Sequence, residues 1–363
     1  MESLRVLIEI GHPAHVHHFK NLIKELESRG HKIKICTTDK DVTIRLLENL
    51  GFEYELLGKN LGKSLFGKLK LILLAEFRMY QISKQFNPDI FVSRCSPISA
   101  QVSKIIGKPH ISFNDTEHTN ISDALAVPFT EAICVPSCFV KSFRGKGIRY
   151  NGYKELAYLH PKYFIPEPTV LKDEGIHLEE KFAILRLISW NAHHDINEKG
   201  IDDIIEFVKK LNQEIKVIIS SEKKLPEELQ KFAVKINPEK IHHLLYFASL
   251  YIGEGATMAT EAAILGTPAV YISSLARTMG NFNELENEYG LLYSFDDSSK
   301  ALGKAMEILN HSESKKEWAI KRNRMLDTKI DVTRFMVWFI ENFPNSFNYC
   351  KENPHNEYTY NLK

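Results

Sequence analysis

The sequence lacks several patterns that mark common classes of protein. It contains no C-x-x-C pair, and its five cysteines are an odd number, which argues against a disulfide framework and favours a reducing compartment. No run of about eighteen apolar residues occurs, so we expect no membrane span. The formal net charge is only +1, so no overall field attracts nucleic acid, and we expect no such partner.

The first strand–helix–strand pattern also lacks the glycine fingerprint of dinucleotide-binding proteins. Apolar residues predict strands at 4–10 and 32–37, with a helix between them. The loop at 11–15 contains no G-x-G-x-x-G, which excludes NAD, and we expect no other cofactor. Because Met1 leads almost directly into the first strand, we expect no signal peptide and a cytoplasmic location.

Strand and helix patterns alternate along the chain, as in parallel, doubly wound sheets of the α/β class. The 363 residues are enough for two domains, and prolines in 159–171 mark a linker between them. We expect a first domain at 1–160, closed by a strand at 132–135, and a second domain at 170–330. Residues 346–363 are expected to form a polar tail.

The most informative stretch is ASLYIGEGATMATEAAILGTPAVYIS, at 248–273. It predicts a strand, a glycine turn at Gly253–Gly255, a helix from Ala256, and a second strand. A helix start carries unpaired N–H groups and partial positive charge, and glycines let an anion come close. Thr257 adds a hydroxyl, and Glu261 one turn deeper can accept hydrogen bonds from a ribose. A plain turn with glycines for packing explains the spacing equally well.

The segment G-E-G-A-T-M-x-x-E-A-A-x-L-G-T-P-A resembles the donor-nucleotide motif of GT-B-fold sugar-nucleotide enzymes. Together, IGHPAHVHHFKNLIKEL and FNDTEHTNISDAL resemble a largely uncharacterised family of predicted GT-B glycosyltransferases of bacteria and archaea, up to about residue 340. More distantly, the chain is similar to UDP-N-acetylglucosamine 2-epimerases and the peptidoglycan N-acetylglucosaminyltransferase. The resemblance implies two Rossmann-like domains facing each other across a cleft, with a helix at 331–345 crossing back to the first domain.

The resemblance and the positions of polar residues after strands predict a nucleotide-sugar site in the second domain, with UDP as the expected carrier. The serines are expected near phosphate or base, His242 near the nucleobase, and Arg277 and Asn281 near the donor sugar. Each residue alone also has an ordinary surface explanation. The expected set is Ser189, Ser220, Ser221, His242, Gly253, Gly255, Ala256, Thr257, Met258, Glu261, Arg277 and Asn281.

Histidines in the loop after the first strand are candidates for a general base, because imidazole titrates near neutrality. The peptidoglycan enzyme carries a histidine in the corresponding loop, and His15 is its match by position, ahead of His12. The glycine-rich surroundings of that histidine are missing here, and the histidines could simply cap the helix. No carboxylate accompanies them closely, so we expect no metal site.

A second candidate is the segment Asn114–His118, which follows the predicted strand at 110–113. Asp115, Glu117 and His118 put three ionisable groups within four residues. The 2-epimerases place a glutamate-bearing loop at a similar point, so Glu117, paired with His118, is a rival base. The alternative is a solvated loop in which Asp115 caps a helix.

We therefore expect a metal-independent glycosyltransferase that moves a sugar from a nucleotide sugar to a glycan or lipid-linked acceptor in surface polysaccharide biosynthesis. A 2-epimerase and a non-catalytic nucleotide-sugar-binding protein are the alternatives. Residues 61–80 mix lysines with apolar residues. They predict either peripheral contact with anionic lipid, at the inner membrane surface, or a core-facing helix with solvated lysines. The sequence leaves the oligomeric state open.

Overall fold

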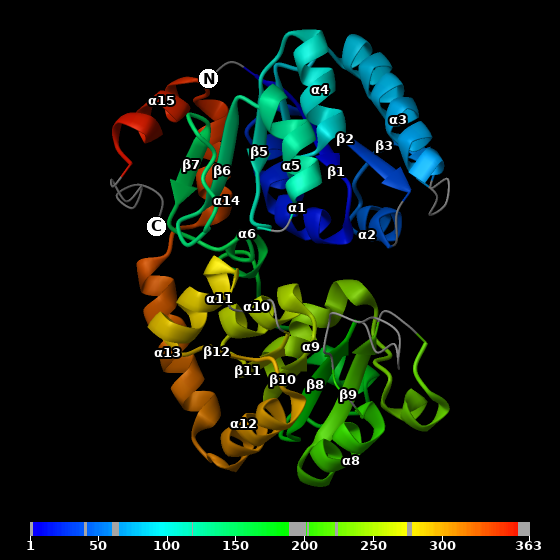
Figure 1. Cartoon of the computed structure of the whole chain (residues 1–363), viewed down its shortest axis with the longest axis vertical. Helices are drawn as coiled ribbons and strands as arrows, with labels where there is room; N and C mark the ends of the chain where they lie inside the picture. Colours follow the sequence, from blue (N-terminus) through cyan, green and yellow to red (C-terminus); the bar gives the residue numbers. More distant parts are fainter. Residues whose placement is uncertain are drawn as a thin grey trace. The chain divides into compact units, whose positions relative to one another are not determined.

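The computed structural model describes residues 3–39, 42–59, 65–117, 119–188, 201, 203–221, 224–273 and 278–354, without the side chains of 59 and 65–70. The chain forms two compact units (Figure 1). Unit 1 contains Met1–Tyr163 and Ile330–Lys363, and unit 2 contains Phe164–Lys329. Each unit has its own parallel sheet with helices and is Rossmann-like, as in the GT-B fold.

Unit 1 is built on a seven-stranded sheet in the order β3-β2-β1-β4-β5-β6-β7. The strands are β1 (Arg5–Ile10), β2 (Lys32–Asp39), β3 (Glu55–Lys59), β4 (Ile90–Ser93), β5 (His110–Phe113), β6 (Ala132–Pro136) and β7 (Gly147–Tyr150). Five of the six residues of the central strand β1 are buried, because both faces of the sheet are covered. Strand order reverses between β1 and β4, and parallel sheets bind ligands at the carboxyl ends beside such a reversal.

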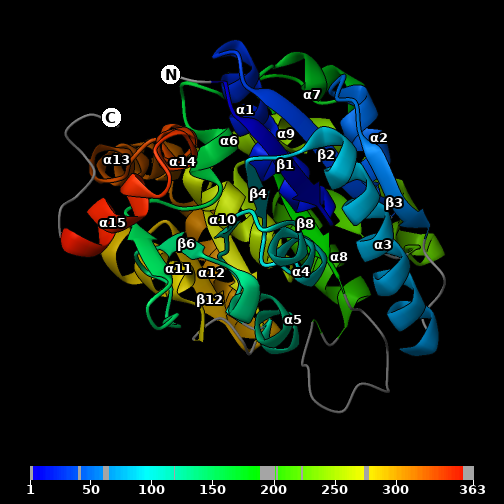
Figure 2. The same ribbon diagram turned by 90° about the horizontal axis from the view of Figure 1, so that it is seen from above.

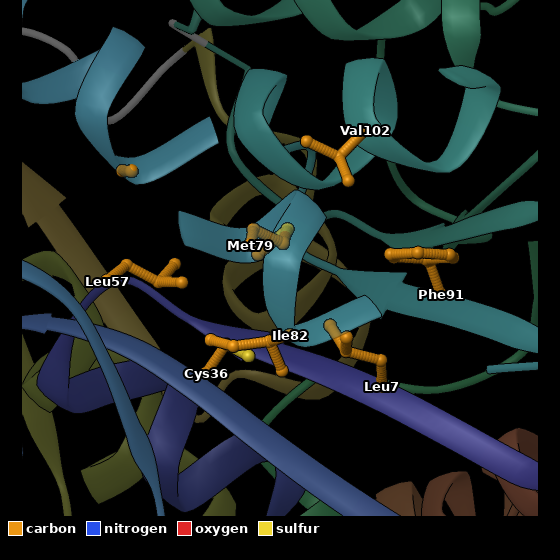
Figure 3. Close-up of a cluster of buried hydrophobic side chains, with 8 residues drawn as sticks. Leu7, Cys36, Leu57, Met79, Ile82, Phe91 and Val102 are labelled. Carbon is orange, nitrogen blue, oxygen red and sulfur yellow. The ribbon is translucent and has the colours of Figure 1, made fainter. Parts of the chain in front are cut away.

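Helices cover both faces of this sheet (Figure 2). On one face lie α1 (Pro13–Ser28), α2 (Thr43–Asn49), α6 (Leu156–Leu159) and α14 (Val332–Glu341). On the other face lie α3 (Leu65–Phe86), α4 (Pro97–Ile106) and α5 (Asn120–Ala126). Beneath α3, Met79 and Ile82 pack among Leu7, Cys36 and Phe91 of the sheet (Figure 3).

The chain returns to unit 1 after unit 2. The N–H of Ile330 donates to the carbonyl of Asn151, and Asp331 caps α14 while accepting from the Tyr163 hydroxyl at 2.7 Å. A further helix, α15 (Asn345–Glu352), follows and contacts β7. Part of the segment expected to be a polar tail is therefore helical, because Cys350 finds a buried position there.

Unit 2 has a five-stranded parallel sheet in the order β12-β11-β10-β8-β9. The strands are β8 (Phe182–Leu187), β9 (Lys216–Ser221), β10 (Leu250–Gly253), β11 (Ala269–Ile272) and β12 (Leu292–Phe295). The helices are α7 (Thr169–Asp173), α8 (Ile204–Glu214), α9 (Ile241–Phe247), α10 (Ala256–Leu265), α11 (Gly280–Glu284), α12 (Ser298–Asn310) and α13 (Ser314–Thr328). The predicted strand–turn–helix–strand of 248–273 corresponds to β10, α10 and β11.

Several elements differ from the sequence-based expectation. Strand β6 does not close the first sheet, because β7 lies beyond it. The sequence did not predict β7, because the exposed Arg149 interrupts its short apolar pattern. The charged helix α13 and the short strand β12 were also missed. Residues 227–232 form a 3-10 helix, with the N–H of Leu229 bonded to the carbonyl of Pro226.

Candidate functional site

The turn between β10 and α10 depends on glycine. Gly253 has a φ of +146°, and a Cβ there would lie 2.2 Å from the carbonyl oxygen of Arg186 on β8. Gly255 is the N-cap of α10 and supplies no side-chain hydrogen bond. The start of this helix therefore presents N–H groups without a capping side chain, and carries partial positive charge.

Glu254 stands in the middle of this turn, yet its carboxylate is directed to backbone donors. One oxygen accepts from the N–H of Ile188 at 2.9 Å, and the other accepts from the N–H of Ile201 at 3.3 Å. The residue is 9% exposed. Two N–H donors thus offset its negative charge and fix the backbone where the chain leaves β8.

Arg186 brings a cation to the same strand ends. Its Nη1 donates to the Oγ of Ser220 at 2.8 Å, and its Cγ lies 2.6 Å from the position of a Cβ on Gly255. The guanidinium stem therefore passes beside the start of α10. Arg186 was not predicted as a site residue, although one signal was available: it is a charged residue inside an otherwise apolar strand, FAILRL.

Glu261 and His242 form a buried pair one turn inside α10. The His242 Nε2 and the Glu261 Oε1 are 2.9 Å apart, and the residues are 3% and 6% exposed. Phe164 lies edge-on to the imidazole, with ring centroids 6.5 Å apart. His242 was expected near the nucleobase, and the structure places it against the carboxylate expected to bind ribose.

Other residues expected to bind the nucleotide sugar differ in where they lie and how exposed they are. Thr257 is exposed and Met258 half-buried, both on the first turn of α10. Asn281 donates to the Oγ1 of Thr260 at 3.3 Å, so its amide lies against α10. Ser189 and Arg277 fall outside the described residues.

In unit 1, the two predicted histidines lie at the start of α1 and both accept hydrogen bonds through Nδ1. His12 caps α1 by accepting from the N–H of Ala14 at 3.2 Å, and His15 accepts from the N–H of Gly11 at 3.3 Å. Burial and the nearby Arg94 guanidinium hold the pKa of His15 well below its usual range. A neutral imidazole that accepts through Nδ1 carries its proton on Nε2, so His15 is arranged as a hydrogen-bond donor.

A buried ionic network lies close to these histidines. Asp115 pairs with Arg94 through one oxygen and with the Nζ of Lys154 through the other, at 2.7 Å for the lysine. Lys154 also contacts Glu155 at 3.1 Å. Two cations and two carboxylates in so little solvent must be paired, because each charge alone would be costly to bury. Asp115 therefore serves here as an anchor for two cations.

Three members of this network were missed by the sequence reading. Arg94 follows β4, while Lys154 and Glu155 follow β7, the strand that was not predicted. Glu117, in the same loop as Asp115, is 7% exposed, and His118 lies outside the described residues. Within the described parts of the chain, no group of three His, Cys, Asp or Glu side chains is placed to hold a metal ion.

The model of the family described as "Protein of unknown function (DUF354)" matches residues 4–339. The chain belongs to the DUF354 family. An uncharacterized protein of Methanocaldococcus jannaschii is 28% identical over 286 residues, which are 74% of this chain and 82% of that protein. This similarity agrees with membership of the DUF354 family, and the description of the relative names no reaction.

Solved structures similar to this DUF354 chain include both sugar-transferring and epimerising enzymes. The S. aureus MnaA–UDP co-structure has a TM-score of 0.69 at 11% identity, covering 94% of this chain and 97% of that one. The UDP-GlcNAc 2-epimerase of Methanocaldococcus jannaschii has a TM-score of 0.62 at 14% identity, covering 88% and 99%. Glycosyltransferase VinC in complex with dTDP has a TM-score of 0.59 at 12% identity, covering 96% and 100%. At such identities these likenesses show the fold.

Proposed function

We propose that this protein binds a nucleoside-diphosphate sugar in unit 2 and transfers the sugar to a glycan or lipid-linked acceptor used for a surface polysaccharide. UDP is the proposed carrier. The observation that carries the proposal is the combination, at one set of strand ends, of an uncapped helix start, a guanidinium and a buried carboxylate–histidine pair.

The proposed diphosphate contact uses the start of α10 and Arg186. The glycines at 253 and 255 leave the helix start without a capping side chain, and the guanidinium of Arg186 brings positive charge beside it. The backbone N–H groups of Ile188 and Ile201 hold the carboxylate of Glu254, which reduces its repulsion of a bound diphosphate. The same donors would stabilise negative charge on the departing nucleoside diphosphate, so we propose that no metal is needed.

The proposed ribose contact uses Glu261. A carboxylate can accept two hydrogen bonds from neighbouring hydroxyls, and His242 holds this one in place from the side at 2.9 Å. His242 is then a positioning residue for Glu261. This arrangement suits a sugar hydroxyl pair better than a phosphate, which a carboxylate would repel.

For unit 1 we propose that Glu117 is the acid–base group. Asp115 is paired with the two buried cations Arg94 and Lys154, so its negative charge is needed to hold them. His15 offers an Nε2–H, which suits donation to an oxygen better than removal of a proton. Glu117 would accept the proton of the acceptor hydroxyl as that oxygen bonds to the sugar carbon and the nucleoside diphosphate leaves.

The binding part is tested by calorimetry with UDP and dTDP. Arg186→Gln and Glu261→Ala are each expected to weaken nucleotide binding at least about tenfold, because each removes charge-assisted hydrogen bonds. Glu307→Ala, on the exposed side of α12, is the matched control and should bind as the unchanged protein does. Unchanged affinity in both Arg186→Gln and Glu261→Ala would rule out the assigned pocket.

The reaction is tested by product analysis. A 2-epimerase is the second candidate, favoured by the likeness to the archaeal UDP-GlcNAc 2-epimerase. That enzyme would convert UDP-N-acetylglucosamine with no acceptor present, whereas a transferase would consume it only slowly. EDTA is expected to leave transfer unchanged. If the protein binds the nucleotide sugar, and neither His15→Ala nor Glu117→Gln changes any measurable activity, it is a non-catalytic binding protein.

A further inference from the structure

Helix α3 has two apolar faces, and only one of them packs against the sheet of unit 1. On the opposite side, Leu73, Leu74 and Phe77 are 59%, 49% and 62% exposed. A helix that only covers a sheet is expected to carry polar residues on its outer face, so the packing of unit 1 does not explain these three side chains. The face toward the sheet buries Met79 and Ile82 (Figure 3), and Ala75 belongs to the same buried cluster.

The same helix concentrates positive charge. Four cations and the single carboxylate of Glu76 give α3 a formal charge of +3, whereas the whole chain carries only +1. Arg78, beside Phe77, is half exposed, and its nearest carboxylate is that of Glu55 at 4.0 Å. The four cations of α3 are Lys68, Lys70, Arg78 and Lys84.

Other exposed apolar side chains do not combine these two features. Ile105 on α4 and Ile320 on α13 stand alone on their helices, which is ordinary for a protein surface. Ile121 and Leu125 form a pair on α5, but the charge between them is the carboxylate of Asp123, which pairs with Lys141. Within the described chain, α3 thus combines three exposed apolar side chains in five residues with two exposed cations, Arg78 and Lys84.

We propose that the outer face of α3, defined by Leu73, Leu74, Phe77 and Arg78, docks the protein on an anionic lipid surface. The apolar side chains would enter the boundary between headgroups and acyl chains, and the side chains of Arg78 and Lys84 would meet the lipid phosphates. No helix in the described part of the chain has the length and apolar character of a membrane span. Access to a lipid-linked acceptor would follow, and that consequence alone rests on the proposed function.

The test is co-sedimentation of the full chain with vesicles of phosphatidylcholine, alone or mixed with phosphatidylglycerol. Binding to the mixed vesicles is expected to be at least about tenfold tighter, and to weaken as salt is added. Replacing Leu73, Leu74 and Phe77 together by serine should weaken it at least about tenfold. A separate variant, Arg78→Gln with Lys84→Gln, keeps the apolar face and should weaken binding only to the mixed vesicles.

The control is Ile320→Ser, since α13 is also rich in lysine and arginine and Ile320 is 65% exposed. This variant should bind vesicles as the unchanged protein does. Equal vesicle binding by the triple-serine variant and the unchanged protein would overturn the proposal, as would absence of binding to the mixed vesicles. Sedimentation velocity tests whether a second copy of the chain covers this face instead. If the unchanged protein is a dimer and the triple-serine variant is a monomer with unchanged vesicle binding, the face is a dimer interface and the proposal is wrong. Nucleotide affinity is measured separately, so neither failure would be confused with failure of the nucleotide pocket.

Discussion

The two units place polar groups at the same topological position, the carboxyl ends of parallel strands, but they build them differently. In unit 2 the backbone part of the site lies in one stretch, where Gly253 and Gly255 shape the turn and α10 begins. In unit 1 the cluster consists of side chains from separate loops, with Asp115 joining Arg94 to Lys154. A site made by backbone geometry can be recognised in one segment, whereas a network of side chains exists only after the strands are ordered.

The two clusters also differ in how they handle charge. Near the glycine turn, the carboxylates of Glu254 and Glu261 each face N–H donors. Unit 1 buries whole ion pairs, and it also buries Glu9 in β1, whose pKa is raised to about 7 by burial. The cluster of unit 1 should therefore respond more strongly to changes in charge, and the glycine turn of unit 2 to changes in the backbone.

The largest expected effect comes from Asp115→Asn. The substitution leaves Arg94 buried without its carboxylate, so unfolding of unit 1 should become easier by about 3–5 kcal/mol. Urea denaturation followed by hydrogen exchange in β1 to β5 measures it. Glu307→Gln, which breaks an exposed contact with Lys304, is the control and should cost less than about 1 kcal/mol. Similar costs for the two variants would show that the network is not stabilising.

In unit 2, we expect Gly253→Ala to lower the stability strongly, although it adds only one methyl group. Its Cβ would meet the backbone of Arg186 in a conformation with positive φ, so we expect a loss of about 3 kcal/mol. Gly303→Ala in α12 meets nothing within 4 Å and should stabilise by about 0.5–1 kcal/mol. Hydrogen exchange in β8 to β12 reports both, and a tolerated Gly253→Ala would contradict the backbone account of this turn.

The pH dependence of unit 1 can be tested through Glu9→Gln. The pKa of Glu9 in the folded state, about 7, lies above its usual value of 4.5, because burial disfavours the charged form. The folded protein therefore prefers the protonated acid, and stability is lost as the pH rises from about 4.5 to about 7. We expect Glu9→Gln to be neutral near pH 4 and to stabilise by about 2–3 kcal/mol near pH 8. Denaturation at the two pH values checks it, and an equal effect at both would be inconsistent with a raised pKa.

The smallest effect is expected for His242→Ala, which tests the pocket of unit 2 without changing a direct ligand. Loss of the hydrogen bond to Glu261 should weaken nucleotide binding about tenfold, roughly 1–2 kcal/mol. His242→Asn, which keeps an N–H donor, should recover part of that loss. If His242→Asn and His242→Ala bind nucleotide equally, the histidine does not position the carboxylate.

Much of the architecture was accessible from the sequence. Alternating apolar runs predicted two parallel sheets, because strands covered on both faces must be nearly continuous in apolar residues. Glycines before a small-residue helix predicted the turn at 253–255 for the same local reason. Strand β7 could not be predicted, because it has only four residues and Arg149 interrupts its apolar pattern.

The sequence by itself thus determined the fold class, the family resemblance and the glycine turn, since each depends on residues close together in the chain. Only the tertiary structure decided that Asp115 joins Arg94 to Lys154, that Arg186 lies beside Gly255, and that α3 leaves apolar side chains exposed. Those contacts join residues tens of positions apart, and strand order and helix packing fix them. The spacing of residues along the chain determines neither the strand order nor the helix packing.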